Sequence, residues 1–351
     1  MELLTWAGLA LMAFVVVEAA VTVLHPDAEG LVASGVRRGS WWLATGIGAR
    51  WPRTRRHLLG LAGPVLVTVT FVSWIALLVL GLAVAAWPLM SEFTAIPALE
   101  PLTFADAVYF AGGTVTVLGY GDVTPVSTAA KLLSLAGAAA GFTMFTGMAT
   151  YVIEVVNGVG ARNRFTLALH DDTRTGGGAT LVADCLAEGG VDQVRDRCRE
   201  WAGHLRAVEE IVHRYPLVAF TYRSYRTEYD PEPALRHVAE GAVAALLAAG
   251  YRPALRPAAE ALASALTRVQ CTIADRYLPA DVHRRLAEPE PGADDRAAAA
   301  RIDRMVSVSL GEPGPSSAGE SAAEVVFRSH VFLAGLHRWS RMGVASHEWV
   351  E

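Results

Sequence analysis

The stretch TVTVLGYGD, residues 114–122, has the composition of a segment that holds a cation with backbone oxygens. Gly119 and Gly121 permit positive φ values, which residues with a Cβ seldom adopt. Such values can turn successive carbonyl groups toward one axis, and rings of carbonyl oxygens can replace the hydration shell of an ion. The stretch therefore predicts ion coordination by the main chain, without a covalent or proton-transfer step.

The residues before this stretch form an apolar segment that is too short to cross a bilayer. Residues 104–116 predict a half-length helix, with Asp106 near its start, where a carboxylate suits the positive end of the helix dipole. Residues 117–121 then place non-helical backbone at membrane depth. Such backbone is tolerated only where it lines a pore or is buried in protein.

Three long apolar runs indicate a membrane protein. The chain has 351 residues, of which 52% are hydrophobic and 19% charged. The runs are residues 3–24, 58–90 and 132–156, each long enough to cross a hydrocarbon core of about 30 Å. The start MELLTW lacks the basic residues of a signal peptide, so we expect the first run to be a transmembrane helix.

The loop between the first two runs predicts an orientation because cytoplasmic loops collect arginine. It carries Arg37, Arg38, Arg50, Arg53, Arg55 and Arg56. We expect a multi-pass protein of the cell membrane with the N-terminus outside, residues 101–126 on the outer side and everything after residue 156 in the cytoplasm. Arg50, Arg53 and Arg56 also have the spacing of three residues that is typical of a voltage sensor. Pro52 among them and the lack of a surrounding apolar span oppose that interpretation. Trp41 and Trp42 suggest an interfacial helix.

Residues 114–122 resemble the signature sequence of potassium channels, and the resemblance continues through Pro125 to Gly141, where that family has its hinge glycine. Residues 58–157 resemble the two-helix pore module of bacterial potassium channels. The resemblance implies an outer helix, a pore helix, a filter and an inner helix. The chain holds one such loop and a filter needs four, so we expect a homotetramer.

The expected fold class is an all-α membrane protein. Its four parts are an N-terminal transmembrane helix (1–25), a basic cytoplasmic loop (26–57), the pore module (58–157) and an all-α cytoplasmic domain (158–351). Expected partners are further copies of the chain, membrane lipid and an unidentified ligand of the cytoplasmic domain, with no nucleic acid.

The resemblance also implies roles for single residues. The filter carbonyls would belong to Val117, Leu118, Gly119, Tyr120 and Gly121, and K+ at these carbonyls is the only metal ion expected, with no cofactor. Asp122 would lie at the outer mouth, and the residues behind the filter would be Thr114, Thr116, Tyr109 and Phe110.

Two residues depart from the family pattern. Val117 stands where the family has threonine, so the innermost ion site loses a hydroxyl oxygen and should be weaker. Gly113 stands where some members carry a glutamate that braces the outer aspartate. The outer carbonyl sites are unaffected, and we still expect potassium selectivity.

The third run supports a pore through its own spacing. Thr143, Thr146 and Thr150 form one polar stripe, which suits a water-filled cavity, although threonines also bond back to their own helix. We expect a gate near Ile153, where four such helices would converge. Glu154 either rings the inner mouth or marks the interface. Glu18, inside the first run, is either functional, paired with a neighbouring helix or snorkelling.

The cytoplasmic half reads as helical. Val194, Cys198, Trp201, Leu205, Val208 and Val212 recur at steps of four and three, which predicts an amphipathic helix. Further helices are expected at 231–250, 255–277 and 321–342, with flexible links at 176–178, 288–295 and 311–320. The cysteines, Cys185, Cys198 and Cys271, fit no zinc pattern and read as small thiols in a reduced compartment.

No catalytic constellation has workable spacing, so we expect no enzyme. The sequence 170–172, His-Asp-Asp, is either a metal or acid–base cluster or a solvated loop. The run 213–233 mixes Tyr, Phe and Arg and reads as a ligand pocket, a contact between subunits or an aromatic core edge. The expected function is a potassium-selective channel gated by, or assembled through, its cytoplasmic domain. The alternatives are a weakly selective cation channel and a membrane-anchored sensor or enzyme with a non-conducting pore module.

Overall fold

A computed structural model describes residues 2–24, 30–36, 39, 55–96, 101–174, 176–188, 190–215, 222, 224, 226–312 and 315–340. The chain divides into two compact units, Met1–Val156 and Asn157–Glu351. Most of the basic loop, with Trp41 and Trp42, lies outside the described residues, as does much of the run 213–233.

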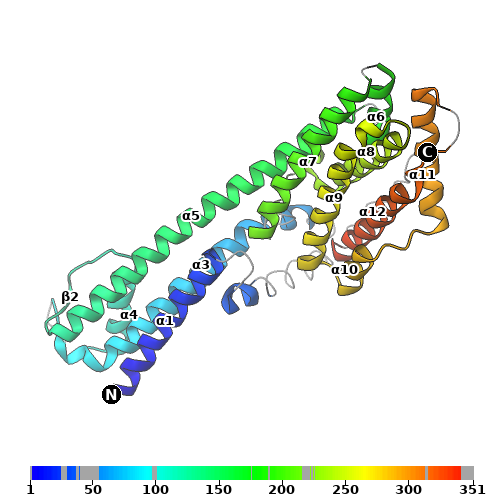
Figure 1. Cartoon of the computed structure of the whole chain (residues 1–351). Helices are drawn as coiled ribbons and strands as arrows, with labels where there is room; N and C mark the ends of the chain where they lie inside the picture. The colour runs from blue at the N-terminus through cyan, green and yellow to red at the C-terminus, as the bar shows by residue number, and fades with distance from the viewer. Residues whose placement is uncertain are drawn as a thin grey trace. The chain divides into compact units, whose positions relative to one another are not determined.

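Three helices of the described chain are long and apolar enough to cross a membrane, as expected. They are α1 (Glu2–Leu24), α3 (Arg55–Ala86) and α5 (Thr128–Asp172), and the candidate span on α3 continues to Glu92. α1 and α3 pack along each other (Figure 1). A Cβ on Gly8 of α1 would lie 2.4 Å from the Gly81 carbonyl oxygen of α3. A glycine is therefore needed at this crossing, as at many membrane helix contacts.

The connection between α3 and α5 is more structured than the sequence predicts. The 3-10 helix η1 (Trp87–Glu92) leads into strand β1 (Phe93–Ala95), which pairs antiparallel with β2 (Val123–Pro125). Between the two strands lie helix α4 (Phe104–Val115) and residues 116–122. The strand pair closes this segment into a loop whose ends are held together, and it was not expected from the sequence.

Helix α4 is the predicted half-length helix. Thr103 is its N-cap, and the Asp106 carboxylate accepts hydrogen bonds from the Thr103 backbone N–H and hydroxyl, both at 2.7 Å. These hydrogen bonds lower the pKa of Asp106 below its ordinary value. The rings of Trp87 and Phe104 meet edge to face, as do those of Phe93 and Phe110, and these contacts fasten the helix to the chain before it.

Helix α5 is longer than the apolar run within it. It continues without a break to Asp172, so the expected loop at 170–172 is wrong. Residues 157–172 contain no proline, and Phe165 and Leu169 give this part a buried face of its own. One helix therefore passes from the first unit into the second.

The second unit is a bundle of helices, as expected. It contains α6 (Gly177–Glu188), α7 (Gly190–Arg214), η3 (Thr227–Tyr229), α8 (Pro231–Tyr251), η4 (Pro253–Leu255), α9 (Arg256–Tyr277), α10 (Ala280–Ala287), α11 (Ala293–Leu310) and α12 (Gly319–Ser340). Residues 238–249 of α8 are all buried, and most are alanine or another small residue. A helix that is apolar all round belongs at the centre of a bundle, and α6, α9, α11 and α12 pack against it (Figure 1).

The structure tests two predictions for this unit, the buried face of α7 and the flexible link at 176–178. All six apolar residues predicted to form the buried face of α7 are buried. The expected flexible link at 176–178 is wrong, because Gly177 and Gly178 begin α6 and are buried. A Cβ on Gly178 would lie 1.8 Å from the His237 carbonyl oxygen, so this glycine serves close packing and not flexibility.

Candidate functional site

The loop after α4 directs its N–H groups back to the helix. Val117 N–H donates to the Thr114 carbonyl at 3.1 Å, and the N–H groups of Leu118 and Gly119 donate to the Gly113 carbonyl at 2.8 and 3.3 Å. Within the described chain, no hydrogen bond ends on a carbonyl of residues 117–121. Three of the five N–H groups of residues 117–121 are therefore bonded to α4, and none of the five carbonyls accepts a hydrogen bond within the described chain.

The backbone φ angles of residues 117–121 alternate between positive and negative values. Val117, Gly119 and Gly121 have φ values of 60°, 57° and 81°, whereas Leu118 and Tyr120 between them do not have positive φ. The two glycines behave as predicted. Val117 is the only described non-glycine residue with positive φ, and for a β-branched residue that conformation is strained. Alternation at every second residue lets consecutive carbonyls point to the same side of the chain.

The free face of this loop is apolar as well as exposed. The side chains of Val117, Leu118 and Tyr120 are 55%, 60% and 65% exposed in the single chain. An apolar patch of this kind marks a surface that meets another molecule. Residues of the loop and of α4 together line a hollow of about 200 Å³, with Tyr109, Thr114 and Asp122 among them.

The predicted supporting residues surround the loop. The Tyr109 and Tyr120 rings stack at 5.8 Å with an interplanar angle of 11°. The Asp122 carboxylate accepts a hydrogen bond from the Tyr109 hydroxyl and raises the pKa of Tyr109 above its ordinary value. The Thr116 hydroxyl donates to the Gly112 carbonyl at 2.7 Å, which ties the first residue after α4 to the helix.

Gly141 has a contact that the sequence did not reveal. A Cβ at Gly141 would lie 2.0 Å from the Val115 carbonyl oxygen, at the last residue of α4. The helix α5 continues through Gly141 without a break. The absence of a side chain at Gly141 therefore lets the end of α4 pack directly against α5. The family resemblance had implied only that Gly141 is a hinge.

The threonines of the α5 stripe bond back to their own helix, as one of the two readings predicted, and the cavity stays a prediction. The hydroxyls of Thr143, Thr146 and Thr150 donate to the carbonyls four residues earlier, at 2.8, 2.9 and 3.1 Å. All three side chains are exposed in the single chain. Ile153, further along the same helix, is 59% exposed.

Glu18 has a definite partner. Its Oε1 accepts hydrogen bonds from the N–H groups of Val32 and Ala33, at 3.1 and 3.3 Å, at the start of the helical segment 31–36. Thr22 accepts from Gly30 N–H at 3.0 Å. The carboxylate, 5% exposed, therefore fastens the chain that follows α1 back onto α1. The sequence offered no signal for this pairing.

The other candidate clusters have structural partners. Asp172 accepts from Arg197 at 2.8 Å and from the Trp201 indole at 3.3 Å, which holds the end of α5 to α7. Among the described residues, no group of three or more His, Cys, Asp or Glu is placed to hold a metal ion. The three cysteines are free thiols.

A comparison with protein families identifies the same region. Residues 64–157 match a family model described as "Ion channel". A stretch of 120 residues, 33% of this chain, is 30% identical to the uncharacterized membrane protein YdjJ of Bacillus subtilis (strain 168) and covers 35% of that protein. A stretch of 55 residues, 14% of this chain, is 42% identical to two pore potassium channel c of Oryza sativa subsp. japonica and covers 12% of it. No solved structure gives a significant match.

These similarities are confined to part of the chain. The match spans about a third of the bacterial relative and about an eighth of the rice relative. The family match begins in α3, contains α4 and the loop 116–122, and ends within α5. Fold and family match together show an all-α membrane protein with an ion channel pore domain.

Proposed function

We propose that the chain is one subunit of a homotetrameric, potassium-selective channel. Four copies of the loop 117–121 line the axis of the pore, and their carbonyl oxygens replace the hydration shell of K+. In this arrangement the exposed faces of Val117 and Tyr120 meet neighbouring copies or the pore, which accounts for apolar side chains that the single chain leaves uncovered.

The backbone of residues 117–121 is the observation that carries this proposal. Positive φ at every second residue, from Val117 to Gly121, combines with three N–H groups that donate to α4 and with carbonyls that accept no hydrogen bond within the described chain. Unpaired backbone carbonyls are costly at membrane depth, so carbonyls without a hydrogen-bond donor are expected where they bind an ion. The rice relative, named as a potassium channel, shares part of this chain's sequence and supports the same ion.

Val117 sets the expected strength of the innermost site. Valine contributes a carbonyl oxygen and no hydroxyl, so an ion there relies on water for the oxygens that a threonine would supply. The sites formed by Leu118, Gly119 and Tyr120 do not depend on this side chain. Selectivity for K+ therefore persists in the proposed channel, with a weaker inner site.

The orientation and the second unit complete the proposal. The arginines after α1 favour a cytoplasmic location for that loop, and with it the loop 116–122 outside and the helical unit inside the cell. α5 carries Gly141 beside α4 and also Phe165 and Leu169, which belong to the core of the helical unit. Movement of the helical unit is thereby transmitted to the pore through one continuous helix, past the gate proposed near Ile153.

The direct test is ion flux through the purified, reconstituted full chain, with K+ compared with Na+. The variants are Val117→Thr and the matched control Val126→Thr, because Val126 is 56% exposed and lies outside the loop. We expect the wild type to prefer K+, Val117→Thr to strengthen that preference, and Val126→Thr to leave it unchanged. Mass measurement of the reconstituted particle should give four copies.

Each contrary result has a distinct meaning. Equal flux of both ions in the wild type, with preference for K+ restored by Val117→Thr, would make the protein a weakly selective cation channel. A tetramer that carries neither ion in any variant or condition would support the sensor or enzyme with a non-conducting pore module. A particle with fewer than four copies would overturn the proposed pore.

A further inference from the structure

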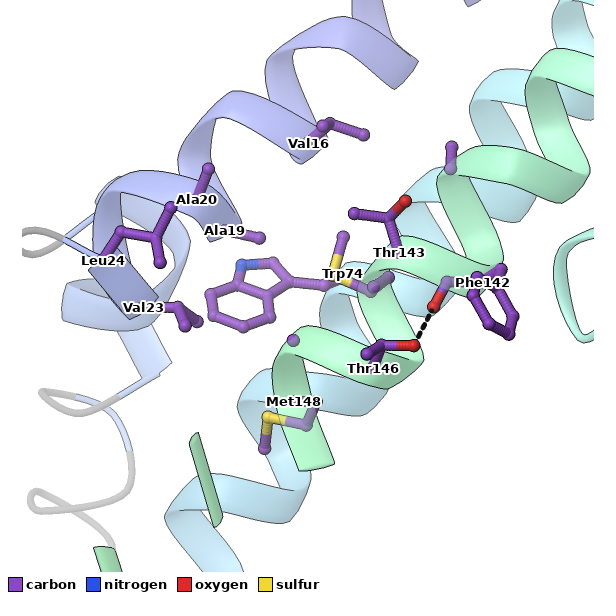
Figure 2. A pocket seen from close by; sticks show the side chains of 13 residues that line it. Val16, Ala19, Ala20, Val23, Leu24, Trp74, Phe142, Thr143, Thr146 and Met148 are labelled. Carbon is purple, nitrogen blue, oxygen red and sulfur yellow. Dashed lines mark hydrogen bonds between the residues drawn. The ribbon is translucent and has the colours of Figure 1, made fainter. Parts of the chain in front are cut away.

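A pocket of about 390 Å³ lies among the three spanning helices, away from the loop 116–122. Its walls are almost entirely apolar and include Ala19, Ala20, Val23 and Leu24 of α1, Trp74 of α3 and Met148 of α5. Figure 2 shows the indole ring of Trp74 reaching from α3 toward the α1 side chains. Thr143 and Thr146 also line it and belong to the stripe whose spacing suits a water-filled cavity, but no occupant is assigned to the apolar walls that α1 and Trp74 contribute.

The position of the pocket along the helices fixes its depth. On α1 it extends to Leu24, the last residue of the helix. On α5 it begins at Ala140, 12 residues after Thr128, and ends at Met148, 20 residues after Thr128. At 1.5 Å per residue these positions are about 18 to 30 Å from the start of α5. In a hydrocarbon core of about 30 Å, the pocket occupies the half that is remote from the loop 116–122.

The Trp74 side chain provides one polar group in this apolar site. It is 2% exposed, and its indole N–H has no acceptor among the described residues. A buried donor without a partner is unfavourable, and tryptophan in membrane proteins usually finds one at the interface. The ring lies beside the last turns of α1 (Figure 2), where the ester groups of a lipid leaflet would be found.

We propose that this pocket binds one acyl chain of a membrane glycerolipid, with the Trp74 indole N–H donating to an ester carbonyl of that lipid. Every lining residue belongs to a candidate span, so the pocket lies within the thickness of the membrane. The acyl chain fills the apolar walls, and the ester supplies the missing acceptor.

Such a lipid would also contact the helix that supports the ion pathway. Thr143, Gly147 and Met148 of the pocket follow Gly141 on α5. An acyl chain seated here stabilises the position of α5 directly beyond its contact with α4. The lipid is therefore a structural component of the spanning unit, and this inference does not depend on which ion the channel selects.

Photolabelling of the full chain in lipid vesicles tests the proposal. The probe is a phosphatidylglycerol that carries a diazirine in one acyl chain, prepared with either ester or ether linkages. Ala20→Trp fills the pocket, and Ala13→Trp is the matched control because Ala13 is exposed on α1 but does not line the pocket. Trp74→Phe keeps an aromatic ring and removes the donor. Labelled residues are identified by mass spectrometry.

In the wild type we expect labels on the pocket residues of α1 and α5, with the ester probe favoured about fivefold over the ether probe, the scale of one net hydrogen bond. Ala20→Trp should reduce this labelling several-fold, Ala13→Trp should not, and Trp74→Phe should abolish the ester preference. Equal labelling in the two Ala→Trp variants would overturn occupancy of the pocket. Equal labelling by the two probes in the wild type would overturn the bond to Trp74.

Discussion

The two units of this protein place their large apolar side chains differently. In the spanning unit, residues such as Leu3, Leu80 and Leu135 are 84%, 43% and 66% exposed. In the described part of the helical unit, Val308 is the one large hydrophobic residue that is exposed. The core of that unit includes Trp201, Phe332 and Leu247, none of which is more than 1% exposed.

This difference shows where each unit finds its stability. The helical unit removes its apolar surface from water within one chain, as a soluble domain does. The spanning unit does not, and its exposed apolar surface suits lipid or, in the proposed channel, further copies of the chain. Its specific internal contacts are instead close approaches of backbone at glycine, such as Gly8 against Gly81 and Gly141 against Val115.

Gly141→Ala should produce the largest effect if close backbone contacts organise the spanning unit. The new methyl group would lie 2.0 Å from the Val115 carbonyl oxygen, so the end of α4 and the loop after it must shift. Overpacking of this kind costs roughly 1–3 kcal/mol, and we expect ion flux in reconstituted vesicles to fall roughly tenfold or more.

Gly160→Ala on the same helix is the matched control. A Cβ at Gly160 would meet only the end of the Arg164 side chain, at an ordinary contact distance of 3.6 Å, so flux should be retained. If the two variants conduct alike, Gly141 does not position α4 in the working channel.

A pair of leucines tests the comparison between the units directly. Leu205 on α7 is fully buried in the helical unit, whereas Leu135 on α5 is 66% exposed. Leu205→Ala should cost about 2–5 kcal/mol and lower the unfolding temperature of the helical unit by roughly 5–15 °C. Leu135→Ala should change it by less than about 2 °C. Protease cleavage within residues 157–351 of the full chain, measured against temperature, follows this transition.

The same variants test communication through α5. Flux measured where the helical unit of Leu205→Ala is unfolded and that of the wild type is folded should differ between the two proteins. Identical flux would mean that the helical unit does not act on the pore. Equal melting of Leu205→Ala and Leu135→Ala would remove the distinction between the units.

Patterns of residue types within single segments were sufficient to predict much of this architecture. The lengths of the apolar runs predicted the three spans, and the steps of three and four predicted the buried face of α7, because both signals repeat within one element. Asp106 at the start of α4 was predicted by the same kind of local reasoning. The glycines of the loop were predicted to have positive φ for the reason that they lack a Cβ.

Contacts between distant residues were not predictable in this way. The positive φ of Val117 opposes the local preference of a β-branched residue, and it occurs where the N–H groups of residues 117–119 bond to α4. The strands β1 and β2 are three residues each, too short for alternation to identify. Glu18 contacts the N–H of Val32, and Gly141 contacts Val115, only because the chain folds back on itself. A periodic pattern of residue types within one segment does not indicate such contacts.

The smallest expected effect concerns the thiols of the helical unit, whose reactivity reports whether water enters the core of that unit. Burial raises the pKa of Cys198 from 9.0 to about 12, whereas Cys271 is partly exposed. Near neutral pH the folded and unfolded chains both keep the Cys198 proton. As the pH rises above about 9, the unfolded chain releases it first, so the free energy of unfolding falls from there toward pH 12. Iodoacetamide at pH 8 should label Cys271 before Cys198 in the folded full chain and both equally in urea. Fast labelling of Cys198 without denaturant would show that water reaches the centre of α7, and that the helical unit resembles the spanning unit more than its burial indicates.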